Sequence, residues 1–99
     1  MLGFDKMFAK EKNMIRIWAK IYKNNRIVKD TIYESIDNFH KETFYVHVQE
    51  LCHKLDIPTP LILNYHISSY IEFNRCIFKP ADFVEQVHFD KLVLEEASL

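Results

Sequence analysis

Residues 40 to 56, HKETFYVHVQELCHKLD, contain three histidines and one cysteine, side chains that bind zinc or act in nucleophilic catalysis. In a helix, His40 and His47 would lie two turns apart, which is about 10 Å along the axis. One zinc ion needs every ligand within roughly 2 Å, and the known helical zinc pair uses i, i+4 spacing. His53 would point away from both. The stretch by itself therefore predicts no metal site.

The same stretch has an apolar stripe with the spacing i, i+4, i+7, i+8 and i+11. Its members are Phe44, Val48, Leu51, Cys52 and Leu55. This spacing predicts a helix over residues 38 to 56 that covers a sheet. We expect Asp37 or Asn38 to cap its start, and Pro58 and Pro60 to end it. Cys52 is then a small buried hydrophobe.

A site could also form from residues that are distant in the sequence. His66, Cys76 or His88 could complete a zinc site, since histidine and cysteine are natural zinc ligands. Arg75 precedes Cys76 and could lower the pKa of its thiol, which a histidine could then activate. No local signature supports either arrangement. We therefore expect no metal ligand and no cofactor.

Acid/base and phosphate chemistry have equally little support. The carboxylates that could gather into a cluster are Glu72, Asp82, Glu85 and Asp90. No pair among them has a diagnostic spacing. The one glycine, Gly3, excludes the glycine-rich loops that bind nucleotide phosphates. We expect no catalytic residue.

The elements that would position any site begin with a hairpin. Residues 14 to 22 alternate between small or aliphatic and larger polar or aromatic side chains, which predicts a half-buried strand. Asn24 and Asn25 follow, and asparagine tolerates the positive φ of a two-residue hairpin turn. Residues 27 to 34 are expected to return as a second strand.

This turn predicts an uninterrupted register for the two strands. The expected pairs are Lys23 with Arg26, Tyr22 with Ile27, Ile21 with Val28, Ala19 with Asp30, Trp18 with Thr31, Ile17 with Ile32 and Arg16 with Tyr33. Lys20 then lies opposite Lys29, a like-charge pair that this register does not explain.

One face of the hairpin is predicted to be aliphatic and the other aromatic and basic. The residues predicted on the second face are Arg16, Trp18, Lys20, Tyr22, Lys29 and Tyr33. Aromatic residues interleaved with cations are typical of single-stranded nucleic-acid platforms. Trp, Tyr and Arg are also enriched at protein interfaces. A structural alternative is that a second helix, or an N-terminal arm with Phe4, Met7 and Phe8, covers this face as a second core layer.

The second half of the chain has weaker patterns. Residues 64 to 74 fit either a helix capped by Asn64 or a strand, and we favour the helix. Pro80 suits the first position of a short turn of helix. Residues 88 to 95 predict a final strand with apolar residues on both faces, which should be central in its sheet or covered on both sides.

Length and composition indicate one folded domain. The chain has 99 residues, of which 48% are hydrophobic and 27% charged, enough to form a core without disulfides. We expect a mobile arm over residues 1 to 13 and a single α+β domain over residues 14 to 99. The predicted fold is a small antiparallel sheet, made from the N-terminal hairpin and the C-terminal strand, packed against one main helix with further short helices.

The charges and cysteines bear on location and partners. The net charge of −1 combines +5 over residues 1 to 33 with −6 over residues 34 to 99. This asymmetry can indicate a basic binding surface, self-association or, as we favour, two segments that neutralise each other after folding. Two cysteines without a CxxC pair predict reduced thiols in the cytoplasm. No stretch has the apolar length of an export signal or a membrane span, so we expect no membrane partner.

The order of the elements resembles a group of short bacterial proteins of unassigned function. The similarity rests on a hairpin, a helix that runs into CHKLDIP, and the later FVEQVHFDKL, and it covers most of residues 14 to 95. It implies a compact α+β domain and assigns no functional residue.

The sequence therefore favours a non-catalytic protein-interaction or structural module, with a homo-oligomer or another protein as partner. The alternative is a single-stranded nucleic-acid binder that uses the aromatic and basic face of the hairpin. A third hypothesis is a metal-dependent or thiol enzyme.

Overall fold

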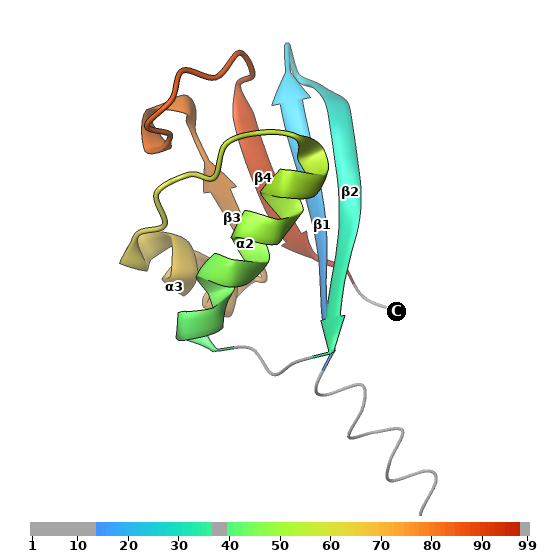
Figure 1. Cartoon of the computed structure of the whole chain (residues 1–99), viewed down its shortest axis with the longest axis vertical. Coiled ribbons are helices and arrows are strands. Elements are labelled where there is room, and N and C mark those ends of the chain that lie inside the picture. The colour runs from blue at the N-terminus through green and yellow to red at the C-terminus, as the bar shows by residue number, and fades with distance from the viewer. Residues whose placement is uncertain (1–13, 37–39, 98–99) are drawn as a thin grey trace, which may run out of the picture.

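The computed structural model describes residues 14–36 and 40–97 as a four-stranded sheet with two helices on one side (Figure 1). In chain order, the elements are β1 (Met14–Lys23), β2 (Arg26–Ile36), α2 (Lys41–Leu55), α3 (Asn64–Phe73), β3 (Arg75–Phe78), the 3-10 helix η1 (Pro80–Asp82) and β4 (Lys91–Glu96). The strand order is β2-β1-β4-β3, and every neighbouring pair is antiparallel. The α+β prediction is confirmed. The predicted N-terminal arm lies outside the described residues.

The turn between β1 and β2 has the predicted two-residue loop. Asn24 and Asn25 both have positive φ, 55° and 64°, as a type I′ hairpin turn requires. Lys23 consequently lies opposite Arg26, and Tyr22 lies opposite Ile27.

The predicted register is wrong beyond Tyr22. An irregularity in the pairing, a β-bulge, lies between Ile21 and Tyr22, so that Ile21 lies opposite Lys29 and Val28 is the additional residue. Lys20 then faces Asp30, and the like-charge pair with Lys29 does not form. A shift of one residue moves every later side chain of β2 to the other face of the sheet.

Helix α2 packs its apolar stripe against the sheet, as predicted. Its buried residues are Phe44, His47, Val48, Leu51, Cys52 and Leu55. The N-cap is His40, whose carbonyl accepts hydrogen bonds from the amides of Thr43 and Phe44, so the predicted caps Asp37 and Asn38 were wrong. Asp56 ends the helix in the left-handed conformation, with φ of 60°.

The chain after α2 contains one strand that the sequence did not predict. Helix α3 is confirmed, although its N-cap is Leu63 rather than Asn64. Asn74 takes a φ of 57° directly after α3, and its amide donates to the Tyr70 carbonyl. This turn feeds β3, whose four residues are too few to give a periodic pattern. Pro80 opens η1, as expected for a proline at the start of a short helix.

Strand β4 is central, between β1 and β3, as its two apolar faces predicted. Leu92 and Leu94 lie opposite Ile21 and Ala19 and belong to the core. The core fills the space between the sheet and the two helices. Its fully buried side chains include Ile17, Phe44, Val48, Leu51, Cys52, Phe78, Leu92 and Leu94.

We expect the substitution Phe44→Ala to lower the free energy of unfolding by about 3–5 kcal/mol, because it leaves a cavity in the centre of the core. Tyr45→Ala is the matched control on the same helix, since Tyr45 is half exposed, and it should change stability by about 0.5 kcal/mol or less. Urea denaturation followed by circular dichroism measures both. Equal losses in the two variants would contradict the packing described for α2.

Candidate functional site

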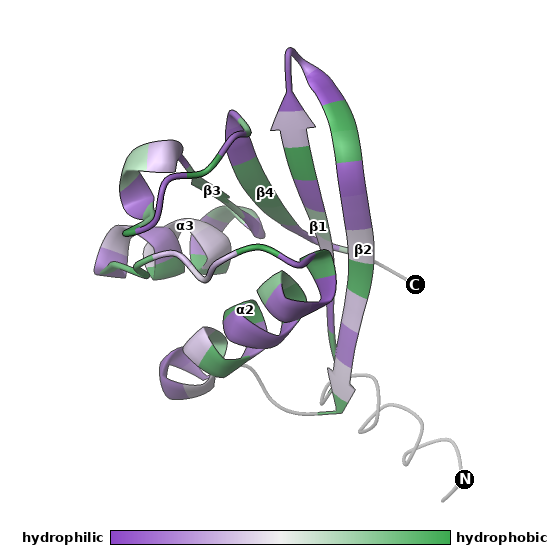
Figure 2. Cartoon of the chain, turned by 45° about the horizontal axis from the view of Figure 1, so that its top comes forward, coloured by the Kyte–Doolittle hydropathy of each residue, from purple (hydrophilic) through white to green (hydrophobic). Residues whose placement is uncertain are grey.

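The candidate site is the side of the sheet that faces away from α2 and α3, here called the outer face (Figure 2). Alternate residues of each strand lie on it, because side chains alternate along a strand and paired residues share a face. Its members are Met14, Arg16, Trp18, Lys20 and Tyr22 of β1, Ile27, Asp30, Ile32, Glu34 and Ile36 of β2, Arg75 and Ile77 of β3, and Lys91, Val93 and Glu95 of β4. Neither of the two described helices lies over it.

Two of the six residues predicted for this face lie on the other side of the sheet. The bulge turns Tyr33 inward, where it is 6% exposed and its hydroxyl lies 2.8 Å from Nδ1 of His47. Lys29 also points inward, and its ammonium donates a 2.7 Å hydrogen bond to the carbonyl of Leu55 at the end of α2. Arg16, Trp18, Lys20 and Tyr22 occupy the outer face as predicted.

Two of the four cations on the outer face, Arg16 and Lys20, are paired with carboxylates of neighbouring strands. Arg16 forms an ion pair with Glu34, its direct neighbour in the register. The ammonium of Lys20 lies 2.5 Å from Oε1 of Glu95. Trp18 donates its indole N–H to Asp30 over 2.8 Å. Arg16 and Lys20, which were predicted on this face and lie on it, are therefore both paired with a carboxylate.

Lys20 contacts both Glu95 and Trp18 at the centre of the outer face. Its ammonium lies 4.1 Å from the centroid of the Trp18 ring, within the range of a cation–π contact. Lys20 is only 6% exposed, and Val93, its partner in the register, is completely buried. On β4, the ammonium of Lys91 lies 5.0 Å from the centroid of the Tyr22 ring. Each aromatic ring of β1 on this face therefore has a cation against it.

The acidic partners of the outer face were missed by the sequence analysis. Asp30, Glu34 and Glu95 bind Trp18, Arg16 and Lys20 on this face, yet none of the three was predicted to lie on it. One signal was present: a one-residue shift of the register replaces the Lys20–Lys29 contact with a Lys20–Asp30 pair. The contribution of β4 had no local signal, because Lys20 and Glu95 are 75 residues apart.

The cysteines and histidines that could have formed a site differ in their burial. Cys52 and Cys76 are free and buried, and burial raises the pKa of each thiol to about 12, so both are protonated at neutral pH. His40 and His53 are exposed, whereas His47 is buried beside Tyr33. Over residues 14–36 and 40–97, no three His, Cys, Asp or Glu side chains gather where they could hold a metal ion.

His66 is the most enclosed of these residues, with 1% exposure. Its Nδ1 accepts a 3.0 Å hydrogen bond from the Leu63 amide, so this nitrogen is not available as a base. Its Nε2 lies 3.4 Å from Oδ2 of Asp82, and its ring packs 4.3 Å from that of Phe78. The same Asp82 accepts hydrogen bonds from Tyr65 and from the Lys79 amide. His66 and Asp82 thus join α3 to η1.

The other carboxylates predicted as a possible cluster do not form one. Asp90 accepts a hydrogen bond from the Asn24 amide at the hairpin turn, and Asp82 is engaged with α3 and η1. Glu72 and Glu85 are exposed on different segments.

Comparison with known proteins finds no family model, no curated protein and no solved structure that matches this chain. The resemblance to short bacterial proteins stays a prediction. None of the helices described here is long and apolar enough to cross a membrane.

Glu95 gives the outer face a pH dependence. The hydrogen bond from Lys20 lowers the pKa of Glu95, and the charges of Lys20 and Arg75 add to this, although burial opposes it. Because the folded pKa is below the unfolded one, the stabilisation is complete above the unfolded pKa and is lost as the pH falls through the folded pKa. Its size is about 0.5 kcal/mol or less, since the carboxylate is half exposed.

We therefore expect Glu95→Gln to make the free energy of unfolding less sensitive to acid, with its difference from wild type present at neutral pH and absent at acidic pH. Chemical denaturation across this range measures it. Glu85→Gln, which changes an exposed carboxylate away from the outer face, should run parallel to wild type. A constant offset between Glu95→Gln and wild type at all pH values would contradict the pairing.

Both thiols should be unreactive in the folded protein. Burial and the raised pKa leave almost no thiolate at neutral pH, and the thiolate is the species that attacks disulfide reagents. We expect an aromatic disulfide reagent to modify Cys52 and Cys76 only at the rate of unfolding, and to titrate both at once in denaturant. Rapid modification of either cysteine in the native protein would support an activated thiol instead. The variants Cys52→Ser and Cys76→Ser assign the signal.

Proposed function

We propose that this protein is a non-catalytic interaction module that self-associates through the outer face of its sheet. The observation that carries the proposal is the pairing of charges on that face around Trp18 and Lys20. Trp, Tyr and Arg are the residues that contribute most at protein interfaces, and charges that are already paired need less desolvation on association.

The same pairing disfavours a nucleic-acid partner. A single-stranded nucleic acid is bound by cations that release counterions as they contact phosphates. Arg16 and Lys20 would have to leave Glu34 and Glu95 to do so, and both carboxylates would remain beside the phosphates. Lys29, the third predicted cation, is on the opposite side of the sheet.

A second copy is the partner that fits the charge balance. The outer face has four cations and three carboxylates, a formal net charge of +1. In a two-fold symmetric contact this face meets itself, and a nearly neutral face does so without net repulsion. Ile32 adds apolar surface to it, with 46% exposure. Two such sheets can stack about 10 Å apart.

We also propose a cytoplasmic location, because Cys52 and Cys76 are free thiols and cytoplasmic proteins keep their thiols reduced. The resemblance to short bacterial proteins supports a bacterial source.

The substitution Ile32→Lys tests the interface. It places an unpaired cation in the proposed contact, so the dissociation constant of the dimer should rise roughly tenfold or more, which corresponds to about 1.4 kcal/mol. Sedimentation or light scattering across the micromolar range measures it. Val46→Lys is the matched control, since Val46 has a nearly equal exposure of 45% but lies on α2, away from the outer face.

The proposal fails if the wild type is monomeric across that range, or if Val46→Lys weakens the association as much as Ile32→Lys. Salt-sensitive binding of a labelled single strand that Arg16→Glu abolishes would show that the outer face serves nucleic acid instead.

A further inference from the structure

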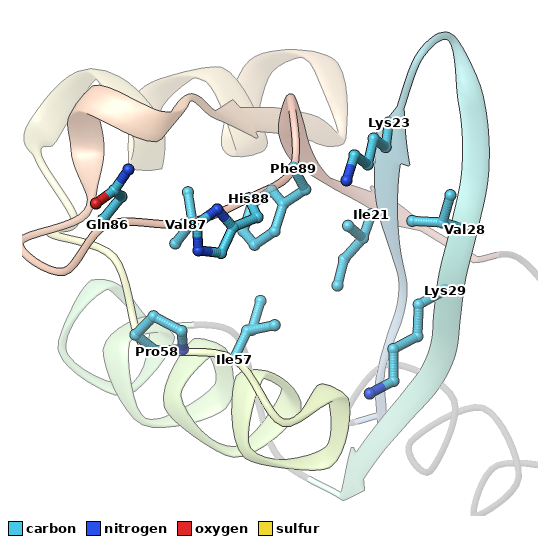
Figure 3. A pocket seen from close by; sticks show the side chains of 10 residues that line it. All are labelled: Ile21, Lys23, Val28, Lys29, Ile57, Pro58, Gln86, Val87, His88 and Phe89. Atoms are coloured by element: carbon cyan, nitrogen blue, oxygen red, sulfur yellow. The ribbon is translucent and has the colours of Figure 1, made fainter.

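An apolar pocket lies on the inner side of the sheet, near the hairpin turn (Figure 3). Its volume is about 390 Å³, within the range of roughly 300–1,000 Å³ that is typical of small-molecule sites. Ile21 forms one wall, Ile57 forms another, and Val87 and Phe89 come from the segment before β4. Three segments that are distant in the sequence therefore meet around it, on the opposite side of the sheet from the outer face.

Hydrogen bonds between the segments fix the shape of this pocket. The amide of Asp90 donates to the Tyr22 carbonyl, and its carboxylate accepts from the Asn24 amide, both over 2.8 Å. On the other wall, the amide of Ile57 donates to the Cys52 carbonyl over 3.0 Å. A pocket with walls held in this way loses little conformational entropy when a ligand binds.

The charged side chains at the pocket are the two lysines, Lys23 and Lys29. Lys23 and Lys29 extend from the hairpin on either side of Ile21, and His88 lies across from them (Figure 3). None of the described residues that line the pocket is acidic. In the described part of the chain, no carboxylate forms an ion pair with Lys23 or Lys29. Lys29 donates one of its three N–H groups to Leu55, which leaves two for a ligand.

From this combination we propose that the pocket binds a small amphipathic carboxylate, in which an unbranched apolar chain ends in one anionic group. The chain lies among Ile21, Ile57 and Phe89, which offer no hydrogen bonds to a polar ligand. The carboxylate lies at the end of the pocket beside Lys23, where its hydrogen bonds are charge-assisted. This binding activity is separate from the proposed self-association, because it uses the other side of the sheet.

Octanoate is the probe that tests this proposal on the full chain. Titration followed by amide chemical shifts should move the signals of Ile57, Val87 and Phe89, whereas those of the outer face should not move. Octanol has the same chain length but no charge. It should bind at least roughly tenfold more weakly than octanoate, because it cannot form the charge-assisted hydrogen bonds. Acetate, which lacks the chain, should not bind. Equal binding of octanoate and octanol, or no shift at millimolar octanoate, would overturn the proposal.

Variants separate the charge from the apolar pocket. Lys23→Gln should raise the Kd for octanoate roughly threefold to tenfold, and Lys79→Gln, an exposed lysine outside the pocket, should leave it unchanged. Val28→Phe fills the pocket from a position that is 56% exposed and should abolish binding. Val84→Phe, at 82% exposure outside the pocket, is its control. If both Lys23→Gln and Val28→Phe fold and bind octanoate like the wild type, the site is wrong.

Discussion

The β-bulge at Val28 decides which side chains of β2 lie on which face of the sheet. The Asn24–Asn25 turn alone would place Lys20 against Lys29. The additional residue instead gives Lys20 a carboxylate partner, Asp30, directly opposite. One backbone irregularity thus replaces a repulsive contact by an attractive one. The face of every β2 residue after Val28 depends on it.

The bulge has consequences on both sides of the sheet. On the outer face, it brings Glu34 beside Arg16 and lets Asp30 accept the indole N–H of Trp18. On the inner face, it carries Tyr33 to His47, where a polar ring pair fills the edge of the core. Cross-strand pairs of this kind are the main source of stability within an antiparallel sheet, at about 0.2–1 kcal/mol each. The same register therefore places Asp30, Ile32 and Glu34 at the proposed interface and Lys29 at the proposed pocket.

Three of the residues that first suggested catalysis are buried in the core. Cys52 and Cys76 are buried hydrophobes with raised pKa values, and His66 uses Nδ1 to accept the Leu63 amide. A histidine that satisfies a backbone donor inside a core stabilises a turn and cannot at the same time accept a proton from a substrate at that nitrogen. The chemistry of this protein, as we propose it, lies in its surfaces: a neutralised aromatic face and a cationic apolar pocket.

The sequence by itself determined the elements that depend on local periodicity and turn chemistry. Alternation fixed β1, the asparagine pair fixed the hairpin turn, and the spacing from Phe44 to Leu55 fixed α2. Four of the six residues predicted for the outer face were consequently correct. Only the tertiary structure decided the bulge, the strand β3 and the acidic partners. These depend on contacts such as that of Lys20 with Glu95, 75 residues away, which no local pattern records.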